Sequence, residues 1–122
     1  MTPALFVLLA IAGGIGAVLR FMLDGAVRRA VGGRWPWGTA LINVSGSFLL
    51  GLLTALAGRG LPPEVLLVLG TGLLGGYTTF STAAYETVRL LEQQRWGAAL
   101  VHGLGQVVVA TLLAAVGYLV GS

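Results

Sequence analysis

Four long stretches without Asp, Glu, Lys or Arg constrain this chain more than any other feature. They cover residues 1–19, 35–58, 65–85 and 96–122. An α-helix rises ~1.5 Å per residue, so about 20 apolar residues cross the ~30 Å hydrocarbon core of a bilayer. Each stretch is therefore long enough to span a membrane once. The sequence predicts an all-α membrane protein with a single four-helix transmembrane domain over residues 1–122 and spans near residues 4–23, 37–57, 65–88 and 97–120.

The composition excludes several function classes. Hydrophobic residues make up 57% of the chain and charged residues only 9%, whereas a soluble domain carries roughly 25% charged residues. There is no cysteine, and no set of nucleophile, base and orienting group appears, so we expect no enzyme activity. All seven basic residues are arginines that lie between the hydrophobic stretches. This is typical of membrane edges, and we expect the partner to be a lipid bilayer and no nucleic acid.

The glycines and the arginines bear on assembly and orientation. The 20 glycines supply small faces on each predicted span, which favour close helix packing in lipid. Four short helices leave little room for an internal pathway, so we expect a homo-oligomer, in the first instance a dimer.

With four spans, one side of the membrane has only Arg59, and the other has Arg28, Arg29, Arg34, Arg89 and Arg95. The positive-inside rule then places the first and third loops in the cytoplasm.

Residues 75–82 (GGYTTFST) form the most informative polar segment inside a span. A Gly-Gly pair followed by two threonines is a poor helix sequence at the bilayer midplane. A break there would free carbonyls and amides that could hold an ion, as broken helices of transport proteins do. The alternative is a kinked helix whose threonine hydroxyls bond back to the backbone. We favour the ion site, because glycines, hydroxyls and an aromatic ring coincide.

Other polar residues within the spans have two interpretations each. Asn43 could serve the function or form an interhelical hydrogen bond, and Arg20 could attract anions to a vestibule or anchor the topology. His102 and Gln106 share a helix face, with Thr111 near the same side, and the three could line a pore. His102 could be a proton relay or a hydrogen-bonded filler. Glu86 is expected to pair with an arginine. No carboxylate lies in the central part of a span, which speaks against a proton-coupled pump.

Three motifs in order on the first three spans resemble the Fluc/CrcB fluoride channel family: residues 13–21 (GGIGAVLRF), 38–51 and 72–82 (GLLGGYTTFST). The resemblance covers essentially the whole chain. It implies an antiparallel, dual-topology homodimer in the cell (inner) membrane, with the third helix broken at its centre. It also implies a structural Na⁺ held by the backbone carbonyls of Gly75 and Thr78 of both subunits. A hard cation prefers such oxygen ligands.

The resemblance further implies a passive path that exports toxic fluoride from the cell. Fluoride must exchange its water for donors, which Asn43, Ser81 and Thr39 could supply. Phe80 matches the pore phenylalanine, whose ring edge is electropositive. Arg20 matches the first-helix arginine and would raise the local anion concentration.

The chain departs from the family where a second phenylalanine often follows the first by three residues, since Ala83 stands there. One wall of the aromatic cage is then missing or supplied elsewhere, for example by Tyr85.

Two other functions remain open from the residues alone. A small four-helix multidrug or cation exporter would need a membrane carboxylate, and none precedes Asp24 in the first span. A non-transporting membrane assembly protein would leave residues 75–82 unexplained.

Overall fold

The computed structural model describes all residues from Met1 to Ser122 and contains only helices and short connections. Four helices are long and apolar enough to cross a membrane: Pro3–Val31, Trp37–Ala57, Pro63–Glu92 and Trp96–Gly121. The first, second and fourth are α1, α2 and α6. The third is composed of α3 (Pro63–Val65), the π-helix η1 (Leu66–Leu74), α4 (Gly75–Tyr77) and α5 (Ser81–Glu92). The all-helical membrane architecture is therefore confirmed.

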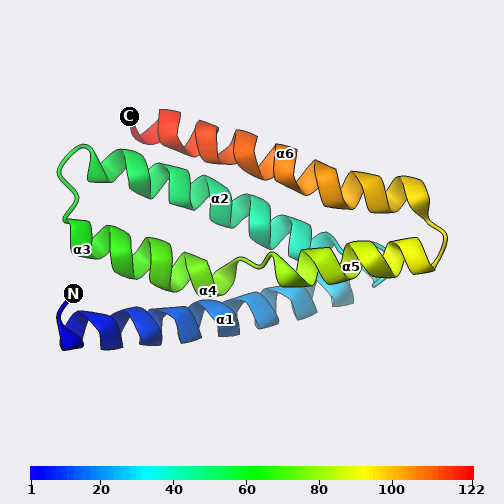
Figure 1. Cartoon of the computed structure of the whole chain (residues 1–122), viewed down its shortest axis with the longest axis horizontal. Helices are drawn as coiled ribbons and strands as arrows, with labels where there is room; N and C mark the ends of the chain where they lie inside the picture. The colour runs from blue at the N-terminus through cyan, green and yellow to red at the C-terminus, as the bar shows by residue number, and fades with distance from the viewer.

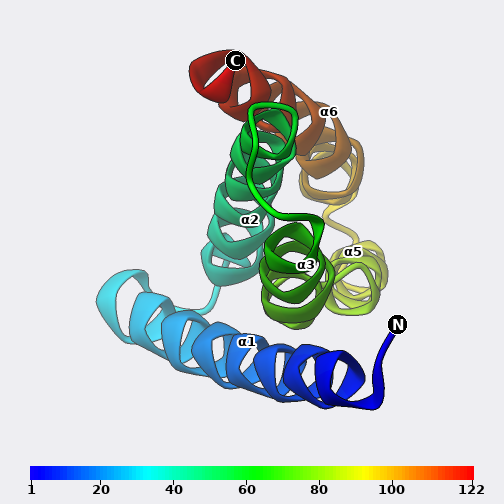
Figure 2. The same ribbon diagram turned by 90° about the vertical axis from the view of Figure 1, so that its left-hand side faces the viewer.

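The helices form a thin bundle in which the third span occupies the middle. In Figure 1, α1 and α6 lie on opposite sides of the molecule, and the third span runs between α1 and α2. The view along the helices in Figure 2 shows α1 separated from α6 by α2 and the third span. Only 17 of the 122 residues are buried. Most large apolar side chains therefore face outward, as expected when lipid is the solvent.

Local sequence signals at the two ends of α1 explain where this helix begins and ends. The hydroxyl of Thr2 accepts a hydrogen bond from the Leu5 N–H at 3.1 Å, which caps the first turn. The helix continues past residue 23 to Val31, and an ion pair of 3.2 Å between Asp24 and Arg28, one turn apart, supports this extension. It ends at Gly32, whose φ of 83° suits glycine.

Glycines set the distance between α1 and the third span. A Cβ atom at Gly76 would overlap the backbone of Gly13, and one at Gly16 would overlap the Leu73 carbonyl. The two helices therefore touch backbone to backbone, as small residues allow in membranes. This contact holds α4 against α1, directly before the segment that interrupts the third span.

The third span departs from a regular α-helix in two places, in its first half and at its centre. Residues 78–80 are not helical, and Thr78 adopts extended angles (φ −81°, ψ 160°) before α5 begins at Ser81. The span bends by only 22°, so its two halves remain nearly collinear. This is a milder feature than the central break that the sequence predicts, and an opened ion site at this point stays a prediction. The nine-residue π-helix before it was not predicted from the sequence.

Candidate ion pathway

The side chain of Asn43 on α2 replaces helical hydrogen bonds at the interruption. Its Oδ1 accepts from the Thr79 N–H at 2.8 Å, and its Nδ2 donates to the Thr79 carbonyl at 2.8 Å. The second Nδ2 proton goes to Gln106 Oε1 on α6, at 2.9 Å. A polar backbone group without a partner is costly at membrane depth. Asn43 thus stabilises the interruption by pairing both backbone groups of Thr79. In this structure both N–H groups of its amide already have acceptors.

The same contacts release two backbone carbonyls from their helical partners. In a regular helix the Gly75 carbonyl would accept from the Thr79 N–H, which here donates to Asn43. The Thr78 carbonyl would accept from the Thr82 N–H, which donates to the Thr79 hydroxyl at 3.2 Å instead. Both oxygens are hard ligands of the type that Na⁺ prefers. The donor set at Gly75 and Thr78 therefore fits the cation that the resemblance implies.

A wide groove runs along one side of the interruption. It has a volume of about 720 Å³ and lies between α2, the third span and α6. Gly75, Thr78, Asn43 and Gln106 all line it. Phe80 lies at this groove with its side chain almost free, because the residue is 83% exposed. A large aromatic ring that takes no part in the packing of the subunit is available for contact with an ion or a second subunit.

A smaller cavity of about 290 Å³ lies on the α1 side of the interruption. Arg20, Thr39, Thr79 and Thr82 line it. The Nε of Arg20 donates to the Gly76 carbonyl at 3.3 Å. The guanidinium is therefore directed at the interrupted helix, and the structure places it beside the threonine hydroxyls. Thr39 is buried here.

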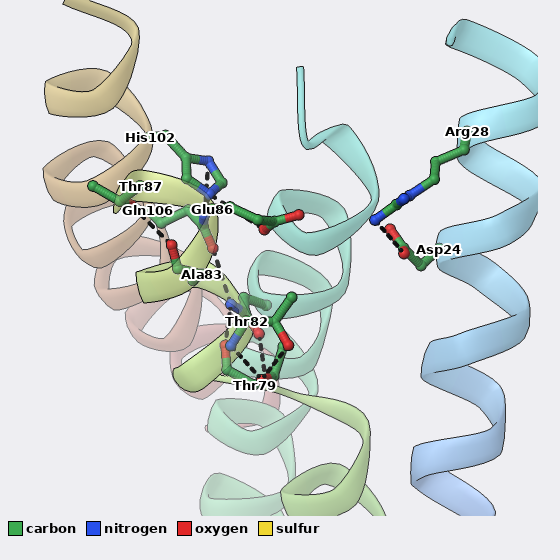
Figure 3. A network of polar contacts seen from close by, with 10 residues as sticks. Asp24, Arg28, Thr79, Thr82, Ala83, Glu86, Thr87, His102 and Gln106 are labelled. Atoms are coloured by element: carbon green, nitrogen blue, oxygen red, sulfur yellow. Dashed lines mark hydrogen bonds and ion pairs between the residues drawn. The ribbon is translucent and has the colours of Figure 1, made fainter. Parts of the chain in front are cut away.

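A second set of polar side chains continues from Asn43 through Gln106 and His102 on α6 to Glu86 in the middle of α5 (Figure 3). The Nε2 of Gln106 lies 3.0 Å from the His102 ring nitrogens. His102 Nε2 lies 3.5 Å from Glu86 Oε1. The structure thus joins His102 and Gln106, as their spacing of four residues predicts. The expectation that Glu86 pairs with an arginine is wrong, because α6 brings His102 to it.

Two predicted residues lie outside this network. The hydroxyl of Thr111 donates to the Val107 carbonyl at 2.7 Å, and the residue is exposed. Ser81 is exposed at the start of α5, where its hydroxyl lies 3.4 Å from that of Thr79. The structure therefore brings Ser81 to the interruption and leaves Thr111 on the outer face of α6.

Sequence reasoning did not assign roles to Thr79 and Thr82, which organise the site. The Thr79 hydroxyl donates to Thr82 Oγ1 at 3.1 Å and accepts from the Thr82 N–H. The signal was the pair of hydroxyls three residues apart, since a threonine hydroxyl near the start of a helix can accept from an N–H three residues later. Both threonines lie in residues 75–82, where the sequence predicts a broken helix.

Comparison with known proteins gives consistent matches over nearly the whole chain. The family model described as "CrcB-like protein, Camphor Resistance (CrcB)" matches residues 7–118. A protein of Leifsonia xyli named fluoride-specific ion channel FluC 1 is 54% identical over 99% of this chain and 89% of its own length. FluC 2 of Moorella thermoacetica is 48% identical over 88% of each chain. FluC of Thermus thermophilus is 41% identical over 95% of this chain and 92% of its own.

Proposed function

This chain belongs to the CrcB family of fluoride-specific ion channels, and from that premise we propose that it conducts fluoride passively along the interrupted third span. The chain is a multi-pass membrane protein and not an enzyme. The proposed path rests on one observation: Asn43 forms two hydrogen bonds with the backbone of Thr79, beside a groove lined by the exposed ring of Phe80. A multidrug exporter is not favoured, because the relatives are fluoride channels.

The proposed path uses neutral groups in place of charges. Fluoride is strongly hydrated, so a pore has to offer donors that replace its water. Asn43 supplies the amide N–H that donates to Gln106 when no anion is present, Ser81 supplies a hydroxyl at the start of α5, and Thr39 supplies one in the smaller cavity. The ring edge of Phe80 presents positive charge density to an anion. Arg20 raises the anion concentration from the α1 side, where its guanidinium reaches Gly76.

We propose a structural Na⁺ at the released carbonyls of Gly75 and Thr78. A bound cation would lower the electrostatic cost of an anion at the centre of the membrane. The support is the diversion of their two helical donors to Asn43 and Thr79. Two oxygens are too few for a sodium ion, and a second subunit would supply two more.

We propose that the subunit pairs with a second copy in antiparallel, dual-topology orientation in the cell (inner) membrane. The groove that exposes Gly75 and Phe80 supports this, because a second copy seated there would cover both. The chain has no cysteine, and a side chain at Gly33 would meet nothing within 4 Å. Gly33→Cys in intact cells should therefore be labelled by an impermeant maleimide in about half of the molecules. Complete labelling or none would overturn dual topology.

Fluoride efflux from proteoliposomes tests the function directly. Vesicles loaded with potassium fluoride and opened to potassium flow with valinomycin should release fluoride onto an electrode. Chloride-loaded vesicles should release at least about a hundredfold less, a difference of roughly 2.7 kcal/mol in barrier. Equal release of the two anions would contradict the proposal, as would fluoride release no faster than from protein-free vesicles.

A further inference from the structure

The hydrogen-bond network behind Asn43 has one fixed direction, which a backbone group sets. The Thr79 N–H can only donate, so the Asn43 atom that faces it is Oδ1, and Nδ2 faces away. Asn43 Nδ2 then donates to Gln106, whose Oε1 must face it at 2.9 Å. Gln106 Nε2 is left to face His102. Each amide thus fixes the direction of the next, from Thr79 to the ring of His102.

His102 completes the network only when its ring is neutral. Gln106 Nε2 donates, so the ring nitrogen that faces it has to carry a lone pair. With the proton on Nε2, Nδ1 keeps its lone pair and accepts from Gln106, while Glu86 Oε1 lies 3.5 Å from Nε2. The His102 side chain is only 1% exposed, and the ring of Trp35 stands edge-on to it with centroids 5.9 Å apart. Water therefore has little access to replace a lost partner.

A second proton on His102 makes both ring nitrogens donors, so neither can accept from Gln106 and the order of the network breaks. Gln106 would have to turn its amide to offer Oε1 to the ring, which brings its Nε2 to face Asn43 Nδ2. Asn43 cannot turn in response, because the Thr79 N–H and carbonyl hold both of its ends. Two N–H groups then converge without an acceptor between them. Both residues line the groove at Phe80, so an anion in the groove can accept from both.

We propose that His102 is a positioning residue whose proton sets the direction of the Gln106 amide, so that fluoride is bound between Asn43 and Gln106 when His102 is protonated. This inference rests on the proposed fluoride path and gives it a pH dependence. Fluoride flux rises as pH falls, because the proton on the ring turns the Gln106 amide and brings two N–H groups to the groove. By linkage, fluoride in the groove favours the protonated ring.

The groups around the ring limit the alternative sources of such a pH effect. Glu86 on α5 is the charged side chain in contact with His102, and its Oε1 is buried without a hydrogen-bond partner. Neither α2 nor α6 carries any other ionisable side chain near the ring, because α2 has none and α6 adds only Tyr118. The cavity that Glu86 also borders is lined by further titratable groups: Asp24, Arg28, Arg34, Tyr85 and Arg89. His102 is the only histidine in the chain.

Flux and ring protonation can be measured separately. Fluoride efflux should rise severalfold between about pH 8 and about pH 5.5, with at most about a tenfold change per pH unit for one proton. His102→Asn keeps an acceptor that takes no proton, so its flux should be low and flat with pH. Gln106→Met removes the connection to Asn43 and should also be flat. Glu92→Gln, at an exposed carboxylate, should keep the parent profile. Protein-free vesicles at each pH correct for leakage of neutral HF.

Nuclear magnetic resonance of the single labelled histidine gives a readout that does not depend on transport. Sodium fluoride, compared with sodium chloride, should shift the midpoint of the ring titration to higher pH in the parent and not in Gln106→Met. Identical profiles in the parent and His102→Asn, or a midpoint indifferent to fluoride, would overturn the inference. Fluoride flux that persists in that case leaves the channel function intact. Absence of fluoride flux at every pH would refute both.

Discussion

The side-chain amide of Asn43 pairs with both backbone groups of Thr79, accepting from its N–H and donating to its carbonyl at 2.8 Å each. This double contact between α2 and the third span replaces the helical hydrogen bonds that the Thr79 backbone does not make. It satisfies the backbone of Thr79 and, by taking its N–H, releases the carbonyl of Gly75. One residue of α2 thus makes an irregular segment stable inside the membrane.

Asn43→Asp should impair both stability and conduction. A carboxylate still accepts from the Thr79 N–H but cannot donate to the Thr79 carbonyl or to Gln106, and it adds negative charge to an anion path. We expect fluoride flux to fall at least about tenfold and the free energy of unfolding to drop by about 1–3 kcal/mol. Thr54→Val, at an exposed hydroxyl bonded within α2, should change neither. Undiminished flux in Asn43→Asp would remove Asn43 from the path.

Phe80→Ile should separate conduction from folding. The ring is 83% exposed, so its loss should alter the free energy of unfolding by no more than about 0.5 kcal/mol. An aliphatic side chain has no electropositive edge, and we expect fluoride flux to fall severalfold or more. Phe6→Ile on α1, which is also exposed, should keep full flux. Equal flux in both variants, measured in the same vesicle assay, would assign Phe80 to the lipid-facing surface.

Arg20→Gln should lower flux most at low fluoride and low ionic strength. The guanidinium lies beside the interruption, where its charge attracts anions. Salt screens such attraction, with a Debye length of about 10 Å at 0.1 M. The deficit should therefore shrink as an impermeant salt is added. Arg29→Gln, an exposed arginine in the last turn of α1, is the control. A deficit that is independent of salt would indicate that Arg20 acts through its bond to Gly76 alone.

Gly16→Ala should disrupt the contact between α1 and the third span. Its Cβ would overlap the Leu73 carbonyl, whereas the Cβ of Gly14→Ala would meet nothing within 4 Å. Overpacking of this kind costs about 1–3 kcal/mol. We expect Gly16→Ala to show a lower melting temperature in detergent and less monodisperse protein, and Gly14→Ala to match the parent. Similar melting of the two variants would mean that α1 can move away without loss.

Removal of sodium should abolish conduction if the carbonyls of Gly75 and Thr78 hold the ion. Protein purified and reconstituted in N-methyl-D-glucamine should show little fluoride flux, and sodium should restore it with a saturating dose dependence. Potassium at the same concentration is the control for ionic strength. Full flux in sodium-free vesicles would exclude a structural Na⁺, and the released carbonyls would then need another partner.

The pattern of charges was enough to predict four membrane spans, because lipid admits few charged residues and a helix needs about 20 residues to cross it. The motif at residues 75–82 predicted a broken helix, because Gly-Gly and Thr-Thr resist a regular helix, and the structure has a milder irregularity there, with residues 78–80 not helical and a bend of 22°. These features depend on local composition, which a single sequence contains. The spacing of four residues also predicted that His102 and Gln106 share one face of α6.

Only the tertiary structure decided which groups meet across helices. Nothing in the sequence shows that Asn43 contacts Thr79, because 36 residues separate them. The pairing of Glu86 with His102 instead of an arginine, and the direction of Arg20 toward Gly76, were decided in the same way. Such contacts depend on how far the glycines let the helices approach and on the rotation of each helix about its axis. Hydrophobic content leaves both undetermined, and packing in three dimensions sets them.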